Sequence, residues 1–250
     1  MSSLTYPKFT VIIATYNCCS TLEKSIDSFF DQKYVNKELI IIDGGSVDGT
    51  VDIIKKFSNK LAYWISEPDK GVYDAWNKGL KKATGDWISF LGGDDIYLPN
   101  ALQNYSYFIQ KHPDYSFDHI SSLSNLVKND KKIRVIGSPW VWRSFKRSMT
   151  VAHVGSFHSK YFFEKYGIFD NTYKISGDYE ILLRARESLK AGFFNIPTVS
   201  MGFGGISDSI SVFDETMRAK INTAGRSPVL CYLESKYGSF KFRIRKRLWY

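Results

Sequence analysis

Short apolar runs and amphipathic segments alternate along the first hundred residues. Four runs rich in β-branched and aromatic residues predict buried strands, namely Phe9–Ala14, Leu39–Ile42, Leu61–Ile65 and Trp87–Leu91. Between them, apolar residues recur at helical spacing and predict helices after a Ser20–Glu23 capping box, at Thr50–Phe57 and at Gly71–Ala83. Strands that alternate with helices imply βαβ units. We therefore expect an α/β fold with a Rossmann-like, mostly parallel central sheet flanked by helices.

The pattern changes after Pro99. Helices are predicted at Ala101–Gln110, Tyr161–Tyr166 and Tyr179–Leu189, and weaker strands at Ser116–Val127 and Ile133–Ile136. No linker rich in Pro, Gly or Ser separates the two halves. We therefore expect residues 1–250 to form a single domain, with one half at about 1–98, a second at about 99–235 and a basic tail at about 236–250.

Polar residues follow three of the four strands predicted in the first half. Thr15 and Asn17 come after the first, Asp43 ends the second, and Asp94–Asp95 follow the fourth through Gly92–Gly93. Doubly wound sheets bind ligands beyond the carboxyl ends of their strands, so these residues are candidates for one site. Neighbouring carboxylates repel each other unless a cation lies between them, and oxygen ligands suit Mg²⁺ or Mn²⁺ shared with a substrate phosphate. A solvated turn is the alternative, since Gly and Asp are common in turns.

The positive charge of the chain is local. The formal net charge is +9, and 24% of the residues are charged. Lys128–Arg147 holds seven Lys or Arg residues and one acid, and Lys236–Tyr250 holds six and no acid. The remainder is slightly acidic, so we interpret the two basic segments as partner-facing. No nucleic-acid recognition motif accompanies them, and no nucleic-acid partner is expected.

The tail has the pattern of a surface helix. A helix over Lys236–Tyr250 would align Phe240, Ile244 and Leu248 among cations, which suits an anionic membrane surface; a solvated tail is the alternative. No signal peptide and no apolar run of about 20 residues is present. Three cysteines without a framework spacing favour a reducing compartment. We expect a cytoplasmic protein, peripheral on the inner face of the cell membrane.

Four ordered segments carry a family pattern: Thr10–Asn17, Ile41–Thr50, Glu67–Gly79 and Asp94–Asp95. Together they closely resemble the family 2 glycosyltransferases of GT-A fold, and in particular the bacterial enzymes that build O-antigen, capsule and exopolysaccharide. A second cluster of similarity lies at His153–Arg184. The resemblance implies a GT-A domain whose first half binds a nucleotide sugar, and a C-terminal helical region that binds the acceptor.

The resemblance also implies a role for each matching residue. Donor contacts are expected from Thr15, Tyr16, Asn17, Asp43, Asp69, Lys70, Gly71, Asp74, Asn77 and Asp94. Asp43 is expected to accept hydrogen bonds from the base or ribose, although a plain turn residue is the alternative. Asp95 is expected to ligate Mn²⁺ or Mg²⁺, with Asp94 supporting the ion or contacting the ribose. Glycine stands where the family has an earlier acid, so the metal has two candidate carboxylates instead of three.

An acidic residue in the second cluster supplies the expected catalytic base. The acceptor is an alcohol whose proton must be taken during attack, and Asp178 in Ile175–Glu180 is the expected base. Glu180 is the alternative base, and a plain N-cap is the structural interpretation of Asp178. His153 is interpreted either as a phosphate or acceptor contact or as a structural histidine. Gly202–Ser207 resembles the flexible glycine-rich stretch that these enzymes carry near the acceptor site.

The activity implied by the resemblance is sugar transfer with inversion. A metal-dependent glycosyltransferase would move a sugar from a nucleotide sugar, expected to be UDP-linked, to a hydroxyl of a polyprenyl-diphosphate-linked saccharide. A nucleotidyltransferase is the alternative enzyme, but Thr15–Cys19 stands where its glycine-rich phosphate loop would lie. A non-catalytic nucleotide-sugar-binding or scaffolding module is the other alternative.

Overall fold

The computed structural model describes residues 6–128, 131–205 and 208–249, with side chains described up to Ile244. The strands are β1 (Phe9–Thr15), β2 (Lys37–Asp43), β3 (Tyr63–Ser66), β4 (Trp87–Gly92), β5 (Ile96–Tyr97), β6 (His119–Lys128), β7 (Lys131–Ile136), β8 (Phe157–Ser159) and β9 (Ala191–Gly202). The helices are α1 (Leu22–Phe30), α2 (Thr50–Phe57), α3 (Val72–Leu80), α4 (Ala101–Gln110), α5 (Trp142–Phe145), α6 (Lys160–Tyr166), α7 (Gly177–Ala185), the short 3₁₀ helix η1 (Arg186–Ser188), α8 (Val212–Asn222) and α9 (Pro228–Trp249).

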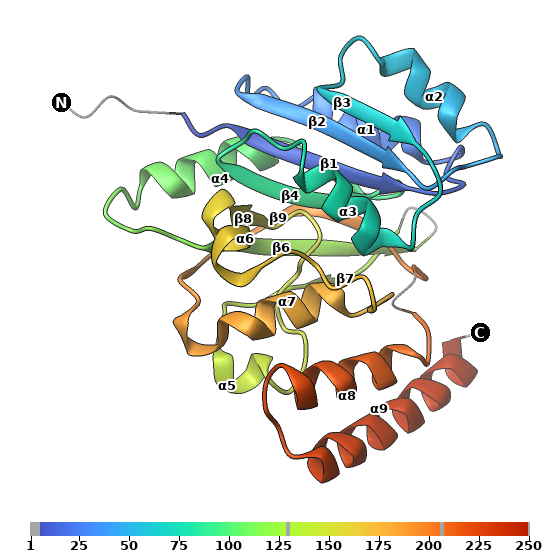
Figure 1. The fold of residues 1–250 in the computed structure, drawn as a ribbon, viewed down its shortest axis with the longest axis vertical. Coiled ribbons are helices and arrows are strands. Elements are labelled where there is room, and N and C mark those ends of the chain that lie inside the picture. Colours follow the sequence, from blue (N-terminus) through green and yellow to red (C-terminus); the bar gives the residue numbers. More distant parts are fainter. Residues whose placement is uncertain (1–5, 129–130, 206–207, 250) are drawn as a thin grey trace.

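One twisted sheet runs through both halves of the chain (Figure 1). Its order is β3-β2-β1-β4-β8-β6-β9-β5, and β7 pairs with the free part of β6. The first four strands are parallel, as the alternating pattern predicts. In their register Thr15 lies beside Asp43, and Ala14 lies beside Gly92. The polar ends of β1, β2 and β4 therefore meet at one edge of the sheet.

Helices cover both faces of this sheet, because its strands are apolar on both sides. Val11 and Ile13 of β1 face a core that α1, α2 and α4 close. Ile12, on the opposite side of the same strand, faces a second core that α3, α6 and α7 close. The α8 and α9 helices lie beyond α7, at the lower end of the molecule in Figure 1. This arrangement confirms the predicted α/β class.

The second half contributes more strands than its sequence predicts. The longest, β9, pairs in parallel with β6, and β8 joins β6 to β4 in antiparallel pairing. Pro197 and the polar Asn195 interrupt the apolar pattern of β9, which hides it from a sequence reading. The ladder accommodates the proline by register shifts on either side of Leu123, its partner in β6. The second half, which was expected to be helical, therefore extends the sheet and adds helices to it.

Two predicted helix boundaries are wrong. The capping box does not form, since α1 begins at Leu22 after the N-cap Thr21, and no side chain caps it. The helix predicted over Tyr179–Leu189 ends as α7 at Ala185, because Arg186 has a positive φ of 49° and so leaves the helical conformation. None of the described helices is long and apolar enough to cross a membrane.

Three buried histidines contact one another, two of them on the strands β6 and β8. His119, His153 and His158 are at most 4% exposed, and the ring of His158 lies 4.7 Å from that of His119 and 5.1 Å from that of His153. Phe90 packs against two of these rings. Burial lowers the pKa of all three, that of His119 to about 3, although Asp178 opposes the shift at His153. The cluster is therefore held neutral.

We expect acid to destabilise the fold through this cluster. The folded-state pKa lies below the ordinary value of 6.5, so the unfolded chain binds more protons. The stabilisation is complete above pH 6.5 and declines below it, by about 1.4 kcal/mol per pH unit for each buried histidine. Urea unfolding at several pH values measures the slope. His158→Phe should flatten it, and the same change at the exposed His112 should not. Equal slopes in all three proteins would contradict the assignment.

Candidate active site

A cavity of about 1130 Å³ opens at the polar edge of the sheet. The ends of β1 and β4 form its floor, and the start of α3 forms one wall. The β6–β7 hairpin, the loop before α7 and the stretch after β9 close the other sides. Residues that are distant in sequence thus meet at one place. The expected site residues in its lining are Thr15, Tyr16, Asn17, Asp69, Gly71, Asp94, Asp95 and Asp178.

The loop after β1 presents a polar rim. Asn17 has a positive φ of 51°, and its side-chain oxygen accepts a hydrogen bond from Val47 N at 3.1 Å. Tyr16 is 62% exposed at the cavity wall. Thr15 Oγ1 is buried and has no hydrogen-bond partner among the described residues. Trp76 Nε1, from α3, is likewise buried and has no hydrogen-bond partner among the described residues. Both atoms belong to residues that line the cavity.

Asp43 is fully buried and does not reach the cavity. Its carboxylate accepts hydrogen bonds from Ser46 N at 2.9 Å, Ser46 Oγ at 2.5 Å and Ser66 Oγ at 2.6 Å, as well as Gly45 N. It therefore holds the loop after β2 in shape. The next residue is Gly44, where a Cβ atom would lie 2.8 Å from Asp69 Oδ2. The glycine thus leaves room for Asp69 to present a carboxylate to the cavity.

Asp94 and Asp95 differ sharply in environment. Asp94 is exposed, whereas Asp95 is 4% exposed and accepts a hydrogen bond from Gly92 N at 2.7 Å. Burial, and then the neighbouring Asp94 charge, raise the pKa of Asp95 to about 8. A buried carboxylate that accepts a single hydrogen bond and lies beside another acid would be stabilised in its ionised form by a nearby cation. The two oxygen-ligand side chains therefore fit a divalent cation of the Mg²⁺ or Mn²⁺ kind.

The glycines before this pair are required by close packing. A Cβ atom on Gly93 would lie 2.9 Å from Thr15 Oγ1 and 3.1 Å from Cys18 Cβ. The turn between β4 and β5 can therefore approach β1 only without a side chain there. Among the described residues no group of three or more His, Cys, Asp or Glu side chains is arranged to hold a metal ion. A cation held by Asp94 and Asp95 would need further ligands from a bound substrate.

Asp178 lies in the first turn of α7, after the N-cap Ser176. The hydroxyl of Tyr73, from α3, lies 3.1 Å from Asp178 Oδ1 and 2.7 Å from the carbonyl oxygen of Ile175. Burial and the charge of Asp178 raise the pKa of Tyr73 well above its ordinary range, so Tyr73 remains a hydrogen-bond donor. Gly177 permits this contact, because a Cβ atom there would lie 2.8 Å from the Tyr73 ring.

Asp178 also lines a second cavity, of about 390 Å³. Its walls come from α7, α8, α9 and the segment after α5. They include the apolar Met149, Val212, Phe213 and Met217 and the charged Arg147, Lys220 and Glu234. Asp178 therefore lies between the large cavity and a smaller one. A carboxylate at such a junction can contact groups that arrive from both sides.

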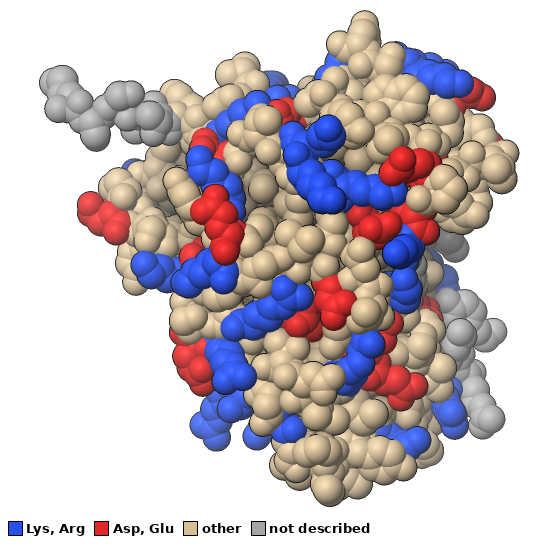
Figure 2. Space-filling view, viewed as in Figure 1, with Lys and Arg blue, Asp and Glu red and all other residues tan. Residues whose placement is uncertain are grey.

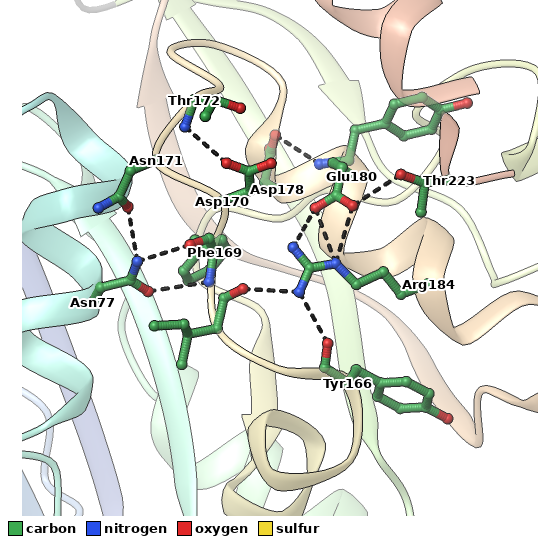
Figure 3. Close-up of polar contacts among 12 residues, drawn as sticks. Asn77, Tyr166, Phe169, Asp170, Asn171, Thr172, Asp178, Glu180, Arg184 and Thr223 are labelled. Carbon is green, nitrogen blue, oxygen red and sulfur yellow. Dashed lines mark hydrogen bonds and ion pairs between the residues drawn. The ribbon is translucent and has the colours of Figure 1, made fainter. Parts of the chain in front are cut away.

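Glu180 does not face either cavity. It is 6% exposed and pairs with Arg184 at 2.5 Å, and one of its oxygens accepts a hydrogen bond from Thr223 Oγ1 at 2.9 Å (Figure 3). Arg184 in turn donates to the carbonyl oxygens of Tyr166 and Ile168. The alternative in which Glu180 is the base is therefore not supported by its position. Glu180 joins α7 to Thr223 at the end of α8 and holds Arg184 in place against the end of α6.

Four other expected site residues lie outside the cavity lining. Asn77 is 6% exposed, and its amide binds the backbone of Phe169 and the side chain of Asn171 (Figure 3). Asp74 accepts hydrogen bonds from Lys70 N at 3.0 Å and Asn171 Nδ2 at 2.9 Å. These residues fix the loop that precedes Asp178. The other two are the exposed Lys70 and the buried His153, whose ring stacks on Trp76 at 5.5 Å.

Several cavity residues are absent from the sequence interpretation. Leu126, Ile133, Arg134 and Ile136 come from the β6–β7 hairpin, and Lys174 comes from the loop before α7. The basic segment around the hairpin is the signal that could have pointed to Arg134. The predicted glycine-rich stretch contributes Gly202–Gly205 to the lining, whereas Ile206 and Ser207 lie outside the described residues. Phe242 of α9 completes the wall.

Comparisons with known proteins agree with this geometry. The profile of Glycosyl transferase family 2 matches residues 10–173. A "PGL/p-HBAD biosynthesis glycosyltransferase" of Mycobacterium tuberculosis strain H37Ra is 31% identical over 217 residues, which cover 82% of this chain and 80% of that protein.

Two solved structures share the fold. S. aureus TarS 1–349 in complex with UDP-GlcNAc superposes with a TM-score of 0.71 at 19% identity, over 90% of this chain and 69% of TarS. The mannosyltransferase PcManGT of Pyrobaculum calidifontis, in complex with GDP-Man and Mn²⁺, gives a TM-score of 0.64 at 16% identity, over 96% and 74%.

Fold and site together define a glycosyltransferase with a GT-A-type α/β architecture. The chain belongs to glycosyl transferase family 2. The predicted resemblance to the family 2 glycosyltransferases is confirmed, and so is the prediction that the protein is an enzyme. The nucleotidyltransferase and the non-catalytic module are therefore set aside.

Proposed function

We propose that the protein transfers a sugar from a nucleotide sugar, UDP-linked, to a hydroxyl of a lipid-linked saccharide, with inversion at the anomeric carbon. The observation that carries the proposal is the shared cavity, which brings Asp69, the Asp94–Asp95 pair and Asp178 around one space. Its volume, about 1130 Å³, exceeds the roughly 300–1,000 Å³ of pockets that hold drug-sized ligands. There is room for a donor and for part of an acceptor.

The donor would lie along the carboxyl ends of β1 and β4. The exposed ring of Tyr16 offers a stacking surface for a base, and Asp69 offers an acceptor for the base or ribose hydroxyls. We assign this contact to Asp69 in place of Asp43, because Asp43 is fully buried and bonded within its own loop. Lys174 and Arg134 add positive charge at the cavity wall, where a diphosphate requires it.

Asp95 and Asp94 would hold Mn²⁺ or Mg²⁺ at the diphosphate. Such an ion neutralises the charge of the phosphates and makes the nucleoside diphosphate a better leaving group. Burial, and then the charge of Asp94, raise the pKa of Asp95, and a cation beside the pair would oppose that rise. PcManGT, which shares the fold, was solved with Mn²⁺.

Asp178 would act as the base for the acceptor. Its carboxylate takes the proton of the acceptor hydroxyl while that oxygen attacks the anomeric carbon and the bond to the phosphate oxygen breaks. Tyr73 positions the carboxylate by a hydrogen bond to Oδ1. One displacement without a covalent intermediate inverts the anomeric configuration. The leaving group departs on the side of Asp94 and Asp95.

The proposed acceptor is a saccharide carried on polyprenyl diphosphate, in the synthesis of a surface polysaccharide such as O-antigen or capsule. This acceptor places the reaction at the cytoplasmic face of the cell membrane. The second cavity beside Asp178 supports the proposal, because Val212, Phe213 and Met217 give it an apolar side next to the charged Lys220 and Glu234. Its chemistry suits a ligand that joins a hydroxyl to apolar groups.

The stereochemistry of the first product tests the reaction type. Water can replace the acceptor, so slow hydrolysis of an α-linked nucleotide sugar with Mn²⁺ should release the β anomer first. Proton NMR distinguishes the anomers before they interconvert. Initial release of the α anomer would contradict a single displacement with Asp178 as the base.

A further inference from the structure

The outer face of α9 carries a continuous row of exposed apolar side chains. Leu230, Leu233, Tyr237, Phe240 and Ile244 are between 43% and 62% exposed. Their spacing alternates between three and four residues, which places them on one stripe of the helix. We call this stripe the outer α9 face. Contiguous apolar side chains on a solvent-exposed surface are typical of sites that bind another protein or a membrane.

The opposite face of α9 is fixed against α8. Cys231 and Ser235 are buried there, and Glu234 pairs with Lys220 at 3.1 Å and with Arg226 at 2.7 Å. Gly238 lets the two helices approach, since a Cβ atom would lie 2.5 Å from the Phe213 ring. These contacts fix the rotation of α9 about its own axis, and the apolar row therefore faces away from α8. Figure 2 shows an uncharged surface at the lower end of the molecule, where α9 begins in Figure 1.

Cations flank the outer α9 face. Lys236, Lys241 and Arg243 are exposed. Lys236 Nζ lies 5.1 Å from the Tyr232 ring, and Lys241 Nζ lies 4.4 Å from the Tyr237 ring, so both stems run along aromatic surface. Glu234 is the sole acid in the sequence of α9, and it is turned toward α8. The outer face thus combines apolar side chains with positive charge alone.

We propose that the outer α9 face docks in the plane of an anionic phospholipid surface. Apolar side chains would enter the boundary between headgroups and acyl chains, and the flanking cations would meet the anionic headgroups. A second copy of the chain is a poorer partner. Two such faces would bring Lys236, Lys241 and Arg243 against their own kind, with no carboxylate on either face to offset them.

The surface begins earlier than the tail interpreted from the sequence. The sequence pattern starts at Phe240, whereas the exposed row starts at Leu230; the side chain of Leu248 lies outside the described residues. Three of the five residues in the row, Leu230, Leu233 and Tyr237, therefore precede the part that the sequence pattern identified. Docking would depend on apolar residues of the first helical turns as well as on the basic cluster.

Docking would bring the cavities close to the lipid. Phe242, on the inner side of α9, lines the large cavity, and Ser235 and Gly238 line the smaller one beside Asp178. A helix with its side chains is about 10–12 Å in diameter. The bilayer surface would thus lie about one helix diameter from both cavities. This step rests on the proposed function, because it gives a lipid-linked acceptor a short path to Asp178.

Vesicle flotation tests the docking surface without any substrate. The full chain should float with vesicles that contain phosphatidylglycerol and much less with phosphatidylcholine alone. Leu233→Ser combined with Phe240→Ser should reduce partitioning by about tenfold or more. Lys236→Gln and Lys241→Gln should each reduce it about fivefold. The matched control is Val35→Ser with Tyr107→Ser, which changes two exposed apolar residues away from α9.

Each other outcome overturns the proposal. Unchanged flotation of the Leu233–Phe240 variant would show that the face is not the docking surface. Equal binding to both kinds of vesicle would remove the role of the cations. A wild-type dimer that the same variant converts to a monomer, with unchanged flotation, would assign the face to a second copy. Nucleotide binding by the same proteins, measured separately, shows whether the proposed function fails independently.

Discussion

Replacing Asp178 by Asn should lower the rate of sugar transfer about 10²–10⁴-fold while donor binding is retained, because the amide cannot accept the acceptor proton. The change conserves shape, and the carbonyl oxygen of the new side chain can still accept the hydrogen bonds from Tyr73 and from the backbone of Tyr179. Steady-state kinetics should therefore show a loss in kcat, with a KM for the donor close to that of the wild type.

Two further variants separate the base from its surroundings. Asp170 lies on the preceding loop and outside the lining of the cavity, where it accepts a hydrogen bond from Thr172 N at 2.9 Å. Asp170→Asn should retain most of the activity. Tyr73→Phe removes a donor from Asp178 and should lower kcat by roughly tenfold, with less effect on KM. If Asp178→Asn retained wild-type transfer, Asp178 would be a structural residue of α7.

Replacing Asp95 by Ala should abolish metal-dependent binding of the nucleotide. Asp95 is the buried member of the acidic pair, and no third carboxylate, histidine or cysteine of the described residues joins the pair to replace it. Calorimetric titration of UDP with and without Mn²⁺ should show a large gain in affinity for the wild type and none for the variant. The residual, metal-independent affinity should be similar in both proteins.

The amide variant separates lost charge from lost packing. Asp95→Asn conserves the acceptor for Gly92 N but removes the charge, and it should show the same loss of metal dependence. Asp52→Ala, at an exposed position on α2, is the control for loss of a carboxylate elsewhere. Retention of the Mn²⁺ effect in Asp95→Asn would contradict the metal assignment.

The shared edge of the sheet could be predicted because strand pairing fixes it. Once β1, β2 and β4 are parallel neighbours, Thr15, Asp43 and the Asp94–Asp95 turn must end together. The pattern of apolar runs carries this information. The direction of each side chain depends on local donors, which the pattern does not encode. Asp43 turns inward because Ser46 and Ser66 bond it there, and Ser66 comes from a different strand.

The cavity walls that the second half of the chain supplies could not be predicted from the sequence pattern. Arg134 and Ile136 reach it only because β7 pairs with the part of β6 that other strands leave free. On the other edge of β6 lies β9, whose apolar pattern is interrupted by Pro197. Asn77 was expected at the donor and instead holds the loop before Asp178. The motif predicted a polar residue at this position, and the tertiary contacts decide which groups it binds.

For the outer α9 face, too, the sequence pattern predicts the residue types, and the tertiary contacts decide which of them are exposed. The sequence pattern identified apolar residues and cations near the end of the chain. The side of α9 that packs on α8 was set by Gly238 and by the ion pairs of Glu234, which only the structure reveals. Those contacts extend the exposed row back to Leu230.

A thermal-shift panel of nucleoside diphosphates and nucleotide sugars, each with and without Mn²⁺, tests the central claim most directly. Binding to the native state raises the melting temperature, by about 5–10 °C at a ligand concentration near 100 times the Kd. The account predicts such a shift for uridine nucleotides, dependent on Mn²⁺ and absent in Asp95→Asn. The absence of a shift with every nucleotide, with the metal present, would contradict a nucleotide-sugar site in this cavity.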